Sequence, residues 1–170
     1  LHSGIAGTAD VILMPEIPYD IDRVIEKVNA RYRSGRNFAI IVAAEGALPV
    51  GGGEVLVEGA TPGAAKRYGG IAEQLGRQIA ERTTHEVRTL VLGHLQRGGT
   101  PTTYDRLVAL RFGAAAVRCV EERKFGTMVA LDPPDIKAVP IEDAVRQIKT
   151  VPIQSDTVQT ARDIGISFGD

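Results

Sequence analysis

The sequence has little that would support a metal site, a disulfide or a membrane span. It contains one cysteine, Cys119, and only three histidines, which are scattered along the chain. A single cysteine excludes a disulfide within the chain, and these residues match no metal-ligand spacing. Cys119 lies in an apolar helical pattern, which predicts a packed side chain rather than a reactive one. No apolar run reaches the roughly 18 residues that a membrane-spanning helix needs.

The charge is also close to balanced. There are 20 Lys and Arg residues against 21 Asp and Glu residues, a formal net charge of -1. This balance argues against partners that are recognised through strong positive charge, such as nucleic acids and anionic membranes. With 44% hydrophobic residues in 170, the composition is that of an ordinary globular protein with one sizeable core. Because no signal-peptide pattern is visible, we expect a cytoplasmic protein.

The first residues have the pattern of a helix end. Leu1 falls within an apolar helical turn, and we expect Gly4 and Gly7 to break that helix. Since proteins rarely begin in the middle of an element, we expect further sequence upstream of Leu1.

Short apolar runs alternate with helical patterns along the rest of the chain. We expect strands at 11–14, 38–44, 87–92 and 128–131. We expect helices from a cap at Asp20 to Gly35, over 71–79, after a capping box at Thr102 and Asp105, over 141–149 and over 156–164. Apolar residues at helical spacing mark the second of these, at Ile71, Leu75 and Ile79, and the third, at Leu107, Leu110, Ala114 and Val117. The alternation predicts an α/β fold with three layers, a mostly parallel sheet with flanking helices. We place one α/β domain at 1–139 and a helical tail at 140–170.

The segment 46–67 is rich in Gly and Pro and predicts a long loop, with a strand-like piece at 54–57. Gly51–Gly53 has no helical pattern behind it, so we interpret it as loop and not as a phosphate cradle.

Two predicted strands end on polar residues that could bind a ligand. Glu45 directly follows the 38–44 run. The 87–92 run leads into the loop LGHLQRGG at 92–99, which contains His94 and Arg97. Ligands of open parallel sheets sit beyond the carboxyl ends of strands. His94 and Arg97 can donate hydrogen bonds to a phosphate group, and the helix that follows could point its N-terminus at the same anion. Glu45 suits a hydroxyl, so the set fits a phosphorylated polyol; the alternative is a glycine turn with surface charge.

The run VRTLVLGHLQRGGTPTTYDRLVALRFGAAAV at 87–117 resembles the 6-phosphofructokinase family. The upstream runs IAGTADVILMPE and FAIIVAAEG occur in the family's order and approximate spacing. The resemblance implies that Glu45 and Arg97 hold hydroxyls of fructose 6-phosphate and that His94 contacts its 6-phosphate. It also implies that Arg88 reaches the phosphate in a neighbouring subunit's site, so that a homo-oligomer is expected. The alternative for Arg88 is a surface ion pair.

The family's allosteric site is matched only in part. Asp10 and Arg36 stand where the resemblance places effector-binding residues, whereas Ser34 and Phe38 replace expected basic ones. We expect nucleotide control in that form to be lost. His2 and His85 are expected to be ordinary surface residues.

Nothing in the sequence matches the family's Gly-rich phosphoryl-donor loops or its catalytic aspartate pair. We therefore expect no catalytic residue in this chain, Mg²⁺ ligands outside it, an N-terminal half as its partner, and no turnover by the chain alone. Two alternatives remain: a sugar-phosphate-binding or regulatory module without catalysis, and a segment for subunit assembly. We also expect the strands at 11–14 and 38–44 to expose apolar surface unless oligomerisation covers it.

Overall fold

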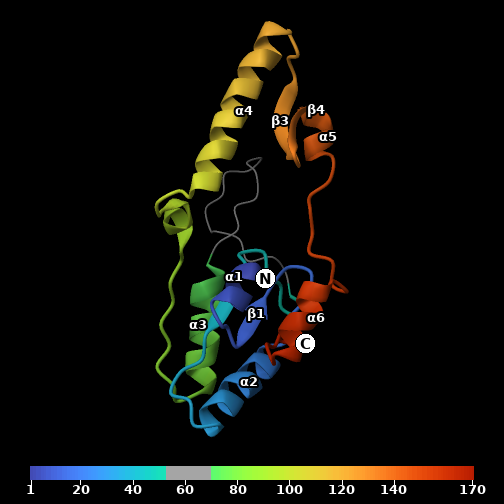
Figure 1. Cartoon of the computed structure of the whole chain (residues 1–170). Helices are drawn as coiled ribbons and strands as arrows, with labels where there is room; N and C mark the ends of the chain where they lie inside the picture. The colour runs from blue at the N-terminus through green and yellow to red at the C-terminus, as the bar shows by residue number, and fades with distance from the viewer. Residues whose placement is uncertain (53–69) are drawn as a thin grey trace. The chain divides into compact units, whose positions relative to one another are not determined.

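The computed structural model describes residues 1–52 and 70–170, so the strand-like piece predicted at 54–57 lies outside the described residues. The chain divides into two compact units (Figure 1). Unit 1 consists of Leu1–Val91 with Thr150–Asp170, and unit 2 consists of Leu92–Lys149. The sequence predicted a different division, into an α/β domain at 1–139 and a helical tail at 140–170, and that division stays a prediction.

Unit 1 is built around a short parallel sheet. Strand β1 (Val11–Leu13) pairs in parallel with β2 (Ile41–Ala43), so that Val11 lies opposite Ile41. On the other side of β1, the backbone N–H of Ile12 donates to the carbonyl of Ser167 at 2.9 Å. The segment at Ser167 therefore runs parallel to β1 as a third extended neighbour.

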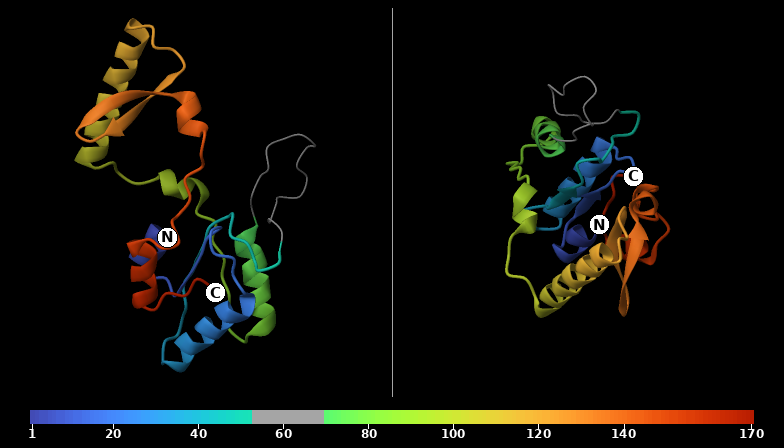
Figure 2. Two further views of the ribbon diagram at one scale, coloured as in Figure 1. Left: turned by 90° about the vertical axis from the view of Figure 1, so that its right-hand side faces the viewer. Right: turned by 90° about the horizontal axis from the view of Figure 1, so that it is seen from above.

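Strand β1 separates two apolar cores. Val11 and Leu13 belong to the core formed with helices α2 (Ile21–Arg33) and α3 (Ile71–Arg82). Ile12 and Met14 belong to the opposite core, which includes α6 (Asp156–Asp163) and contacts α1 (His2–Ala6). Alternate residues of a strand point to opposite faces, so this division follows from the pleat. The three-layer α/β prediction is confirmed (Figure 2).

The burial of β1 corrects one expectation. Residues Val11 to Met14 are all buried, so they expose no apolar surface. The second strand is shorter than the predicted 38–44 run, and Phe38, before it, is 54% exposed. Apolar surface is therefore open at the start of the 38–44 run but not at β1.

Local signals predicted the helices of unit 1 well. The Asp20 side chain accepts a hydrogen bond from the backbone N–H of Asp22 at 2.8 Å and caps α2. Helix α1 ends before Gly7 but passes through Gly4, where a break was wrongly predicted. A Cβ at position 4 would lie 2.5 Å from Cδ1 of Ile12, so this glycine permits close packing of α1 on β1.

The strand predicted at 87–92 is absent. Val87 packs against the core formed with α2 and α3, whereas Leu90 and Val91 are exposed. Neither sheet in the described ranges has a strand paired with this segment. An apolar run becomes a strand only when a neighbour takes up its backbone hydrogen bonds, and periodicity does not identify that neighbour.

Unit 2 is a helix beside a hairpin. A 3₁₀ helix, η1 (Gly93–Arg97), leads to α4 (Thr103–Glu121), whose predicted capping box is confirmed. Strands β3 (Thr127–Asp132) and β4 (Asp135–Pro140) form an antiparallel hairpin, of which only β3 was predicted. Helix α5 (Ile141–Val145) is shorter than the predicted 141–149. Of the helices within the described residues, none is long and apolar enough to cross a membrane.

Candidate functional site

The glycine-rich loop forms one turn of 3₁₀ helix that presents two cationic or polar side chains together. His94 and Arg97 are three residues apart on η1, and side chains at that spacing eclipse one another in a 3₁₀ helix. Both residues are exposed. Gly93 begins the turn and Gly99 follows it, with φ of 47° and 94°, a region that favours glycine. The sequence thus builds a turn that places an imidazole and a guanidinium on one side.

The N-terminus of α4 is closed by its own side chains. The Thr102 hydroxyl accepts from the Asp105 backbone N–H at 3.2 Å, and the Asp105 carboxylate accepts from the Thr102 backbone N–H at 2.8 Å. Asp105 also accepts from the Thr102 hydroxyl at 2.7 Å, and these hydrogen bonds lower the pKa of Asp105. Because a carboxylate already occupies this helix terminus, an anion at the loop would have to be bound by His94 and Arg97 and not by the N-terminus of α4.

Glu45 lies where the sequence predicts, in the turn that follows β2. Ala47, two residues later, is fully buried, and its N–H donates to the carbonyl of Ala44 at 2.9 Å. This buried anchor fixes the turn and leaves the Glu45 side chain exposed. A carboxylate beyond the carboxyl end of a parallel strand is in a position typical of ligand-binding residues in such sheets.

Arg88 forms an ion pair with Glu86, two residues before it in the same segment. Its Nε and Nη2 each lie 2.8 Å from Oε1 of Glu86, and both side chains are highly exposed. Glu86 was not singled out from the sequence, although the two-residue spacing in an extended segment places it on the same side as Arg88. The contact agrees with the surface ion pair considered as the alternative, and the role toward a neighbouring subunit stays a prediction.

The predicted binding residues are divided between the two units. Glu45 and Arg88 belong to unit 1, whereas His94 and Arg97 belong to unit 2. His94 and Arg97 lie on the same element, η1.

Asp10 has a structural role that the sequence did not reveal. Its Oδ1 lies 3.1 Å from Nε of Arg31, and its Oδ2 accepts from the backbone N–H of Ile40 at 2.9 Å. The Asp10–Arg31 contact is an ion pair without the alignment of a hydrogen bond. Arg36, the other residue of the proposed effector remnant, is exposed. An effector role for Asp10 and Arg36 stays a prediction.

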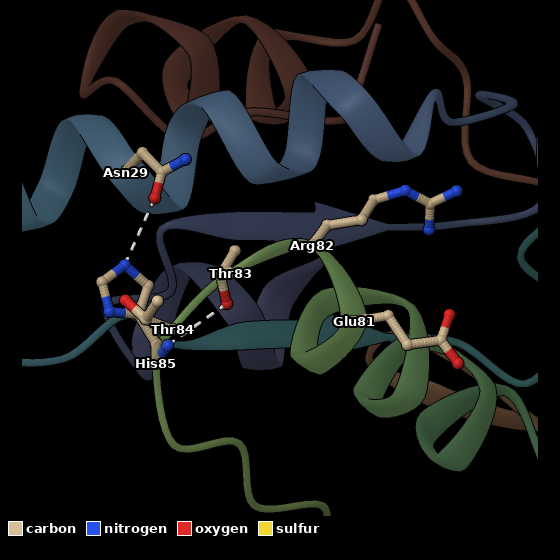
Figure 3. A pocket seen from close by; sticks show the side chains of 6 residues that line it. All are labelled: Asn29, Glu81, Arg82, Thr83, Thr84 and His85. Atoms are coloured by element: carbon tan, nitrogen blue, oxygen red, sulfur yellow. Dashed lines mark hydrogen bonds between the residues drawn. The ribbon is translucent and has the colours of Figure 1, made fainter.

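A pocket of about 520 Å³ lies between α2 and α3, outside the predicted site (Figure 3). His85 lines it, stacked on Tyr32 with ring centroids 3.7 Å apart. His85 Nε2 lies 3.2 Å from Oδ1 of Asn29. The expectation of an ordinary surface histidine was therefore wrong, because the His85 side chain is half-buried, stacks on Tyr32 and contacts Asn29 through Nε2. Among the described residues, no group of three or more His, Cys, Asp or Glu side chains could hold a metal ion.

The chain is similar to known phosphofructokinases. The family profile described as Phosphofructokinase matches residues 1–120. An ATP-dependent 6-phosphofructokinase of Chloroflexus aurantiacus is 51% identical over 170 residues, which are 100% of this chain and 46% of that protein. A pyrophosphate–fructose 6-phosphate 1-phosphotransferase of Amycolatopsis mediterranei is 50% identical over 156 residues, which are 91% of this chain and 45% of that protein.

Solved structures show the same relationship. The Pichia pastoris phosphofructokinase is similar with a TM-score of 0.61 and 26% identity, over 96% of this chain and 17% of that chain. This chain thus spans about half the length of the curated relatives named above. The match of the family profile covers most of the sequence, including η1 and its loop, and the chain therefore belongs to the phosphofructokinase family.

Proposed function

We propose that this chain supplies the sugar-phosphate-binding portion of a 6-phosphofructokinase. The full-length enzyme would transfer a phosphoryl group from ATP or diphosphate to the 1-hydroxyl of fructose 6-phosphate, a step of glycolysis. The observation that carries the proposal is the shared side of His94 and Arg97 on η1, in a chain of this family. The donor stays open, because relatives named for ATP and for pyrophosphate match almost equally, at 51% and 50% identity.

Each proposed residue has a distinct task. His94 and Arg97 lie at one turn, so they can both donate to one ligand: His94 to the 6-phosphate, and Arg97 to sugar hydroxyls. Glu45 would accept a hydrogen bond from another hydroxyl, which a second phosphate could not provide. These contacts bind and orient the acceptor. Orientation of the attacking oxygen is a large part of catalysis in phosphoryl transfer.

Other parts of the proposal concern features beyond these three residues. Arg88 would serve the site of a neighbouring subunit in a homo-oligomer, exchanging Glu86 for a phosphate. Mg²⁺ would neutralise charge on the donor phosphates. We place its ligands outside this chain, in the N-terminal half that would complete the enzyme. A cytoplasmic location stays a prediction.

A chimera tests the proposal against its alternatives. This chain would replace the matching 170 residues of the Chloroflexus aurantiacus relative, and formation of fructose 1,6-bisphosphate would be assayed with ATP and with diphosphate. We expect turnover by the chimera with one donor and none by the chain alone. A folded chimera that binds fructose 6-phosphate without turnover would favour the binding module. One that does neither would favour the assembly segment.

A further inference from the structure

The extended segment 83–91, which carries Arg88, is held to unit 1 by its side chains. Neither sheet in the described ranges includes any residue of this segment, so no strand pairing fixes it there. Burial alternates along the segment: His85 and Val87 are half-buried. Glu86 and Arg88 are exposed. Because alternate residues of extended backbone point to opposite sides, one side of the segment faces the helices of unit 1 and the other presents Arg88.

Two contacts hold the inward side of the segment against α3 and its core. Val87 packs against the core formed with α2 and α3. Thr89 lies directly over the buried Gly76 of α3. A Cβ added at Gly76 would lie 2.6 Å from Cγ2 of Thr89 and 3.7 Å from Cγ1 of Val87. The glycine therefore lets the segment approach the helix more closely than any other residue would.

His85 makes the third inward contact, with α2. Its ring stacks on that of Tyr32, with the ring centroids 3.7 Å apart and the planes 6° apart. Its Nε2 lies 3.2 Å from Oδ1 of Asn29 (Figure 3). Asn29 and Tyr32 are three residues apart on one helix, so both contacts come from the same face of α2. The stack fixes the plane of the imidazole, and the contact with Asn29 fixes its rotation within that plane.

We propose that His85 is a positioning residue for Arg88. The two residues are three apart, so at most about 10 Å of extended backbone separates them. The contacts of His85 and Val87 before Arg88, and that of Thr89 after it, fix the backbone from which the guanidinium projects. Without the imidazole, the segment loses its contact with Tyr32 and Asn29, and the backbone before Val87 is free to move.

A fixed backbone at Arg88 favours the binding of a phosphate group. The inference rests on the proposed function here, in which Arg88 exchanges the carboxylate of Glu86 for a phosphate. The donors of a guanidinium form a rigid fork, so a bidentate contact requires one direction of approach. A side chain that already points in that direction loses less entropy on binding. His85 thus raises the affinity for a phosphorylated ligand without touching it.

A double-mutant cycle in the full-length chimera tests the inference. Titration calorimetry would compare the fructose 6-phosphate affinity of His85→Ala, Arg88→Ala and the double variant. We expect His85→Ala to weaken binding about fivefold, but less than about twofold when Arg88 is already alanine, because a positioning residue acts only through its target. His2→Ala removes an exposed histidine from α1 and is the matched control, which should bind as the wild type does.

A conservative variant separates positioning from a loss of folding. His85→Phe keeps a ring that can stack on Tyr32 and loses only the contact with Asn29, so we expect it to bind more tightly than His85→Ala. Equal losses from His85→Ala in the wild-type and Arg88→Ala backgrounds would overturn the inference, since they would indicate a general structural role. Wild-type affinity in His85→Ala, when Arg88→Ala does weaken binding, would overturn it as well.

NMR relaxation of this chain gives a readout that needs no substrate. We expect His85→Ala to lower the backbone order parameter of the Arg88 N–H and to leave those of α4 unchanged. An unchanged order parameter at Arg88 would overturn the inference even if Arg88→Ala weakened binding. A lowered one, together with wild-type affinity in Arg88→Ala, would support the positioning by His85 and contradict the proposed function of Arg88. The two proposals therefore fail separately.

Discussion

The carboxylate of Asp10 and the guanidinium of Arg31 form an ion pair at the amino end of β1, with 3.1 Å between Oδ1 and Nε. The Asp10 side chain is buried, and that of Arg31 is 27% exposed. Because Asp10 also accepts from the Ile40 backbone, one carboxylate connects α2, β1 and the segment that enters β2. The residue thus fixes the start of the strand that leads to Glu45.

Removing this carboxylate should destabilise unit 1. In Asp10→Ala, Arg31 loses its counter-ion and the Ile40 N–H loses its acceptor. We expect the free energy of unfolding to fall by roughly 2–3 kcal/mol, toward the lower end for a buried pair because Arg31 is partly hydrated. Urea denaturation measures the change. Glu26→Ala, which breaks an exposed pair with Arg23, should cost less than about 1 kcal/mol. Equal losses in the two variants would show that the Asp10 contacts add nothing.

Two helical glycines should respond in opposite directions to alanine. At Gly4 an added methyl group would meet the buried side chain of Ile12, whereas at Gly113 it would meet no atom within 4 Å. We expect Gly4→Ala to lower the stability by about 1–3 kcal/mol through overpacking. Gly113→Ala should raise the stability of α4 by up to about 1 kcal/mol through helix propensity. Thermal unfolding followed by circular dichroism compares them, and a stabilising Gly4→Ala would contradict the packing of α1 on β1.

The capping box of α4 should depend on pH. The hydrogen bonds from Thr102 hold the pKa of Asp105 below its ordinary value. A carboxyl whose pKa is lower in the folded state stabilises that state above its unfolded pKa of about 4, and the effect disappears as pH falls through the folded pKa. We therefore expect the first turn of α4 to loosen only under acid conditions.

Carbon NMR of the Asp105 carboxyl group follows this titration. We expect Thr102→Ala to raise the midpoint toward the ordinary value, since the carboxylate loses the hydrogen bond that the Thr102 hydroxyl donates to it, and the Asp105 N–H loses the hydroxyl that accepts its own hydrogen bond. Thr103→Ala, one residue on, should leave it where it is in the wild type. An unchanged midpoint in Thr102→Ala would mean that the capping box does not control Asp105.

Elements specified by local sequence were predictable. Asp20 caps α2, and Thr102 with Asp105 caps α4, because a cap depends on residues only two or three positions apart. The helix that Ile71, Leu75 and Ile79 marked in the sequence is α3, and these residues are buried in it. These features need no knowledge of distant partners.

Features that depend on distant partners were not predictable. The run at 87–92 is apolar but has no paired strand among the described residues. On α4 the sequence indicated the row at Leu107 and Leu110, which is exposed, whereas Phe112 and Ala115 are the more shielded residues. Both rows are apolar, and periodicity alone cannot say which one a neighbour covers.

The candidate site divides in the same way. The sequence proposed Glu45, His94 and Arg97 through their positions after apolar runs and beside glycines, and their binding roles stay predictions. It did not locate Arg31 or Glu86, which now hold Asp10 and Arg88. Ion pairs of this kind depend on side-chain geometry, and in the case of Asp10 and Arg31 on two elements that meet only in the folded unit.

Calorimetric titration of fructose 6-phosphate into the full-length chimera tests the central claim most directly. The account predicts a saturable heat that Arg97→Ala weakens at least tenfold in affinity. Arg118→Ala, which removes an exposed arginine from the last turn of α4, should bind as the wild type does. A folded chimera that gives no heat, or one in which Arg97→Ala binds with wild-type affinity, would contradict the assignment of η1 to the sugar-phosphate site.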